Sequence, residues 1–147
     1  MSYEVVDGHL HIWNLSEIRD KLPADNASRS FPNDVDSAAI NRTLDLAEIA
    51  PLCERSGVRN AVFVQCFNDA PEEAEWVHRV SQDTPLIKGI VAGLDLEQHE
   101  KLRKNLDAMT KWKVPKLVGV RHITHFVPND YFTRYAKRKT GCRMKFY

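Results

Sequence analysis

Apolar runs recur along this chain at intervals of roughly 28 residues, the length of one strand–helix unit. The runs cover residues 60–66, 87–94 and 116–120, and a further strand is predicted near the N-terminus at about residues 4–12. Continuous apolar runs are typical of strands that are buried on both faces of a parallel sheet. The alternation of strands with helical segments therefore predicts an α/β fold with about four βα units and parallel strands.

The connecting segments have the apolar spacing and the end signals of helices. We expect helices at about residues 44–56, from residue 71, at about residues 97–112 and from about residue 130. Gly57 follows the first of them, where a left-handed C-terminal cap favours glycine. The polar segment 14–42 is too long for an ordinary connection, and loops of that length are usually functional or mobile.

Two architectures fit these units: a doubly wound sheet and a TIM barrel. The first strand-to-helix turn has no GxGxxG fingerprint and the chain has no P-loop, so we expect no nucleotide cofactor. Polar residues follow the strands at their carboxyl ends, where both architectures place their sites. They are His9, His11, Gln65, Asp95, Arg121 and His122.

The run VVDGHLHIW at residues 5–13 delivers two histidines from one strand. Side chains alternate along a strand, so Asp7, His9 and His11 are expected to share a face. Two imidazoles beside a carboxylate can hold a divalent metal ion, here zinc or manganese. The alternative is a strand end whose histidines only form hydrogen bonds with neighbours.

Four further residues are predicted to contact a substrate. Arg121 would hold a carboxylate or ring oxygen through its forked donors, although a salt bridge at a strand end explains it equally well. His122 is adjacent and would point to the opposite side of a regular strand. Gln65 would donate to the substrate, or be a buried amide satisfied by backbone. Trp13 would wall the pocket, or belong to the core.

Charge and cysteine content exclude several classes of function. The formal net charge is +1, which gives no long-range attraction to nucleic acid. There is no long apolar run and no secretory signal, so we expect no membrane association. Three widely spaced cysteines without a CxxC pair fit free thiols in a reducing compartment, and we expect a cytoplasmic protein.

Four blocks of sequence together resemble the amidohydrolase superfamily. The first is VDGHLHIW at residues 6–13, and the others are AVFVQ at 61–65, GIVAGLDL at 89–96 and PKLVGVRHI at 115–123. Within that superfamily they are most similar to the amidohydrolase-related branch, which includes the sugar lactonases acting on rhamnonolactone and fuconolactone. The blocks occur in the same order as in that branch.

The resemblance implies the N-terminal half of a (β/α)8 TIM barrel, because a whole barrel needs about 250 residues. Residues 1–136 would form this partial domain. Residues 137–147 form a divergent basic tail, which we expect to be a truncated or alternative end. The implied activity is the opening of small lactones by water attack on the ring ester, with His9 and His11 as metal ligands.

No position here matches the additional histidine and the aspartate that later strands supply in such enzymes, so other readings stay open. One is a decarboxylase of the same superfamily that acts on a carboxylate substrate. Another is a non-catalytic half-barrel, either a truncated isoform or an interaction module. The first and last of four parallel strands would have unpaired edges, which favour homo-oligomers.

Overall fold

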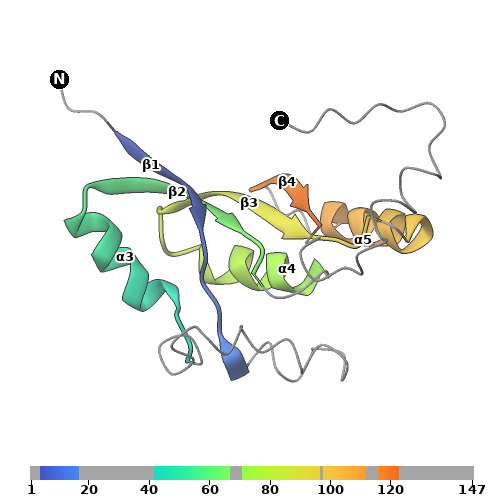
Figure 1. Ribbon diagram of the computed structural model, residues 1–147, viewed down its shortest axis with the longest axis horizontal. Helices are drawn as coiled ribbons and strands as arrows, with labels where there is room; N and C mark the ends of the chain where they lie inside the picture. The colour runs from blue at the N-terminus through green and yellow to red at the C-terminus, as the bar shows by residue number, and fades with distance from the viewer. Residues whose placement is uncertain (1–3, 17–41, 67–70, 97, 112–115, 123–147) are drawn as a thin grey trace, which may run out of the picture.

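The computed structural model describes residues 4–16, 42–66, 71–96, 98–111 and 116–122. Within these residues, parallel strands alternate with helices along the chain (Figure 1). The elements are β1 (Val5–Leu10), α3 (Leu46–Arg55), β2 (Val58–Val64), α4 (Pro71–Val80), β3 (Ile87–Gly93), α5 (His99–Lys111) and β4 (Leu117–Arg121). The strands and helices predicted in this part of the chain are confirmed, with ends that differ by a few residues.

The four strands form one parallel sheet in the order β1-β2-β3-β4. Each strand lies beside the next one in the sequence, and the order never reverses. Because crossovers between parallel strands are right-handed, such an order places all connecting helices on the same side of the sheet. Figure 1 shows α3, α4 and α5 on one side. A doubly wound sheet would need a reversal of strand order, so the arrangement is that of an α/β half-barrel.

The core lies between the sheet and these helices. It is built mainly from β2, β3 and α4, whose apolar side chains are almost fully buried. The largest fully buried apolar side chains are Phe63, Ile12, Ile87, Ile90, Leu94, Met109 and Val77. The continuous apolar runs of the two central strands thus supply the centre of the core, as expected for strands covered by helices.

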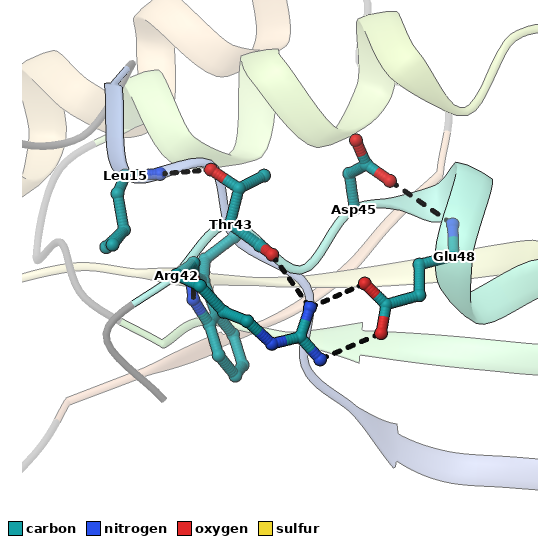
Figure 2. Close-up of polar contacts among 6 residues, drawn as sticks. Leu15, Arg42, Thr43, Asp45 and Glu48 are labelled. Atoms are coloured by element: carbon teal, nitrogen blue, oxygen red, sulfur yellow. Dashed lines mark hydrogen bonds and ion pairs between the residues drawn. The ribbon is translucent and has the colours of Figure 1, made fainter. Parts of the chain in front are cut away.

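Local signals fix the ends of α3. Asp45 is the N-cap, and its carboxylate accepts a hydrogen bond from the backbone N–H of Glu48 at 3.2 Å. Arg42 makes a two-pronged ion pair with Glu48, with contacts of 2.6 and 2.8 Å (Figure 2). At the other end Gly57 has φ of +78°, the left-handed conformation predicted for this glycine.

Some predictions fall outside the described residues. They concern the helix near residue 130, the basic tail at 137–147 and most of the polar segment 14–42. Among the helices that the structure does describe, none is long and apolar enough to cross a membrane.

Candidate functional site

β1 contains a β-bulge between Asp7 and Leu10, the segment that includes His9. Asp7 pairs with Ala61 and Leu10 pairs with Phe63, so three steps along β1 match two steps along β2. Ala61 and Phe63 are two residues apart and share a face of the sheet, which means that Asp7 and Leu10 also share that face. The expectation that Asp7 lies on the same face as His9 and His11 is therefore wrong. The cause is the extra residue, which shifts the alternation by one position.

The bulge is held by a short hydrogen bond within β1. The Asp7 carboxylate accepts from the backbone N–H of His9 at 2.9 Å. The Asp7 carboxylate therefore binds the backbone of His9. It does not lie beside the His9 imidazole as a further metal ligand. Its nearby negative charge still reaches His11, where it favours the protonated imidazole.

The two imidazoles meet at their Nε2 atoms. His9 Nε2 and His11 Nε2 are 3.2 Å apart, and the rings meet edge to face with centroids separated by 4.7 Å. The other nitrogen of His11, Nδ1, donates a hydrogen bond to the carbonyl oxygen of Val64 at 2.8 Å. A carbonyl oxygen only accepts, so in the neutral ring of His11 the proton lies on Nδ1 and Nε2 is an acceptor, which leaves His9 Nε2–H as the donor of their contact.

The surroundings of His11 favour its neutral form. Burial lowers the pKa of His11 from its usual value of 6.5, against the opposing effect of the hydrogen bond to Val64. The charges of His9 and Arg121 lower this pKa further. A neutral imidazole is the form that binds a metal ion.

The distance between the two Nε2 atoms fits metal ligation. Two Zn–N bonds of about 2.0–2.1 Å at a tetrahedral angle place their nitrogens about 3.3 Å apart. The His11–Val64 contact is also the kind of backbone hydrogen bond that orients metal-binding histidines. Across the part of the chain that is described, however, no group of three or more His, Cys, Asp or Glu side chains could hold a metal ion. The described site thus supplies two nitrogen donors.

Arg121 approaches the same region from the opposite edge of the sheet. Its guanidinium donates a hydrogen bond from Nη1 to the carbonyl oxygen of Gln65 at 2.7 Å. Val64 and Gln65 are consecutive at the carboxyl end of β2, so His11 and Arg121 bind neighbouring carbonyl groups. The structure therefore brings these two predicted site residues together, His11 directly after β1 and Arg121 at the end of β4.

Gln65 is buried, with only 1% of its surface exposed. Neither Oε1 nor Nε2 of its amide has a hydrogen-bond partner. The structure therefore pairs this amide with no backbone group. Leaving a buried amide unpaired costs about 1–3 kcal/mol, and unsatisfied groups of this kind are rare outside functional sites.

Trp13 and His122 contact backbone groups of the connections that follow β1 and β3. The indole N–H of Trp13 donates to the carbonyl oxygen of Arg42 at 2.6 Å, and a two-residue bridge joins Trp13 to Leu44. Figure 2 shows the contacts on the α3 side of this connection. Nδ1 of His122 lies 3.2 Å from the carbonyl oxygen of Leu94. The structure gives both residues a role in fixing these segments.

Glu73 lies in the first turn of α4 and is a polar residue that the sequence analysis did not single out. Its side chain is buried, and its carboxylate accepts a hydrogen bond from the backbone N–H of Cys66 at 3.3 Å. Burial and the charge of Glu73 raise the pKa of the Cys66 thiol well above its usual range. The thiol therefore stays protonated, and a protonated thiol is a poor nucleophile. The sequence signal that could have predicted this contact is the carboxylate at the third position of α4, close to the end of β2.

Comparison with known proteins found no family model that matches the chain, no similar curated protein and no similar solved structure. The relation to amidohydrolases remains a prediction that rests on the four sequence blocks.

Proposed function

We propose that the chain provides part of the active site of a metal-dependent hydrolase that opens small lactones. The observation that carries this proposal is the pair of Nε2 atoms 3.2 Å apart, with Nδ1 of His11 bonded to the Val64 carbonyl. A bound zinc or manganese ion would polarise the ring ester carbonyl and lower the pKa of a bound water. The four amidohydrolase-like sequence blocks support the same class of reaction.

Each site residue has a defined task in this proposal. His9 and His11 bind the metal through Nε2. Arg121 has donors beyond the one bonded to Gln65, and these would bind a ring oxygen or a carboxylate of the substrate. The unpaired amide of Gln65 would hydrogen-bond to the substrate after a small rearrangement, because its polar atoms are buried in the unliganded protein.

The test compares lactone hydrolysis by the wild type and by a double variant, His9→Ala with His11→Ala. Sugar lactones are assayed with added zinc or manganese, and ring opening is followed by proton release. His99→Ala is the matched control, because His99 is an exposed histidine at the start of α5. We expect turnover that the double variant abolishes and the control retains. Turnover that the double variant leaves unchanged would contradict the role of the pair.

A decarboxylase of the same superfamily is the related alternative, since Arg121 suits a carboxylate substrate as well as a lactone. Release of carbon dioxide from aromatic or muconic acids without lactone hydrolysis would favour it. A non-catalytic half-barrel is the alternative of another class, and the observation behind it is that no position of the sequence matches the additional histidine and the aspartate of such enzymes. Absence of both activities, with the metal bound, would support that alternative.

A further inference from the structure

The sheet ends in two unpaired strands. In the described residues β1 pairs only with β2, and β4 pairs only with β3. Each outer edge therefore presents a row of backbone N–H and C=O groups, which favours pairing with another strand.

Apolar exposure is concentrated at the same two ends of the molecule. The exposed large apolar side chains of the described residues lie on β1, on β4 and on the flanking helices α3 and α5, whereas β2, β3 and α4 carry none. They are Val5, Val6, Leu52, Leu106, Val118 and Val120. Val6 and Val118 are the most exposed, at 56% and 63%. Four β-branched residues on edge strands suit further strand pairing.

The two edges also carry opposite charges. Glu4 precedes β1 by one residue, and Asp7 lies within this strand. Lys116 precedes β4 by one residue, and its ammonium donates to the Ser81 carbonyl at 3.0 Å. Arg121 ends β4, and its guanidinium donates to the Gln65 carbonyl, so the positive charges belong to β4 but are bound within their own chain. If β4 paired in parallel with a second β1, Glu4 and Lys116 would lie at the same end of the two strands. Such a junction would join an acidic edge to a basic one.

We propose that two copies of this chain join through these edges into a closed barrel of eight parallel strands. β4 of each copy pairs with β1 of the other, so one twofold axis generates both junctions. A second copy is the partner that fits, because its β1 continues the strand direction and the winding of the sheet and keeps every helix outside. Closure removes both open edges and covers the exposed valines. An eight-stranded barrel is also just wide enough for its interior to be filled by side chains.

The first test measures the mass in solution by sedimentation equilibrium over a range of protein concentrations. The wild type is expected to sediment with the mass of two chains. Val118→Glu places an acid on β4 opposite the acidic β1 of the other copy, and Val6→Lys places a base on β1 opposite the basic β4. Each variant is expected to shift the equilibrium to the single chain. Asp83→Lys is the control, because Asp83 is an exposed charge in the turn after α4, away from both edges. A wild type that is a single chain at high concentration would overturn the proposal.

A mixing experiment guards against variants that merely unfold. An equimolar mixture of the Val118→Glu and Val6→Lys chains can form one native junction and one junction with paired opposite charges. Recovery of the two-chain mass on mixing is the expected result, and failure to recover it from two folded variants contradicts edge pairing.

Hydrogen exchange distinguishes edge pairing from stacking of the two open sheet faces. Amides of β1 and β4 should gain protection as the wild-type concentration rises, while those of β2 and β3 stay unchanged. A two-chain species in which the edge amides gain no protection would overturn the proposed barrel.

Discussion

The Nε2 atoms of His9 and His11 face each other at 3.2 Å, close to the separation that two ligands of one zinc ion adopt. The arrangement depends on the second nitrogen of His11, which is bonded to the Val64 carbonyl of the neighbouring strand. The parallel pairing of β1 with β2 thus orients the ring and fixes its tautomer. His9 lies in β1, and His11 follows the strand directly and is bonded to the end of β2, which favours precise positioning of both rings.

The two histidines alone should bind zinc weakly, because a catalytic zinc normally has three protein ligands and a water. We expect a Kd of about 1 μM or weaker in isothermal titration of the metal-free protein at a concentration where it is a single chain. His11→Ala should weaken binding by about tenfold or more, and His99→Ala should not change it. A nanomolar one-to-one site that His11→Ala abolishes would show that a complete site exists.

Stability should fall with acidification below pH 6.5 because of His11. The unfolded chain binds the His11 proton with a pKa near 6.5, whereas burial lowers this pKa in the folded protein. Between pH 6.5 and the lowered pKa of His11 in the folded protein, the unfolded state holds more protons than the folded state. The free energy of unfolding therefore decreases as the pH falls through that window. Above pH 6.5 this group adds no pH dependence.

Urea unfolding of the wild type and of His11→Gln, measured from pH 7.5 down to pH 5, checks this expectation. As the pH falls, the wild type should lose more of its unfolding free energy than the variant does. A difference that is constant over the whole range would contradict the lowered pKa.

The strands and helices could be predicted because their signals are local. The apolar run at 60–66, the proline at the start of α4 and Gly57 each act on their own segment, and each prediction is confirmed. The position of Asp7 could not be predicted in this way. The bulge that moves it arises from how β1 matches β2, and a strand taken alone shows only regular alternation.

The site was predictable only in part for the same reason. His9, His11, Gln65 and Arg121 could be placed at the carboxyl ends of strands from the alternating pattern. That His11 and Arg121 bind the consecutive carbonyl groups of Val64 and Gln65 depends on the order and register of the strands. No residue type in the sequence specifies such a contact between distant segments.

Replacing Gln65 by leucine should stabilise the protein. The amide is buried without a partner, so an apolar side chain of similar size removes an unsatisfied group. We expect Gln65→Leu to raise the free energy of unfolding by about 1 kcal/mol in urea titrations, with loss of any lactonase activity. Gln65→Glu is the contrasting variant and should destabilise, because it buries a charge at the same position. A destabilised Gln65→Leu protein would indicate that the amide is satisfied in solution.

The N-terminal cap of α3, Asp45, should contribute more to the free energy of unfolding than the ion pair between Arg42 and Glu48. Asp45→Ala removes the hydrogen bond to the N–H of Glu48 and should cost about 1 kcal/mol of stability in urea unfolding. Glu48→Gln breaks the exposed pair with Arg42 and should cost less, with an effect that disappears at high salt. A larger loss for Glu48→Gln than for Asp45→Ala would reverse this assignment.

Asp7 should affect metal binding through the backbone of His9. Its carboxylate accepts the His9 N–H inside the bulge, so removal of the acceptor releases the segment that positions one of the two ligands. Asp7→Ala is expected to weaken zinc binding about fivefold, the effect of losing roughly 1 kcal/mol of hydrogen bonding. Asp7→Asn keeps an oxygen acceptor at the same place and should retain most of the affinity. If instead both substitutions weakened binding by the same large factor, the negative charge of Asp7 would be what matters, and the carboxylate would act on the metal itself.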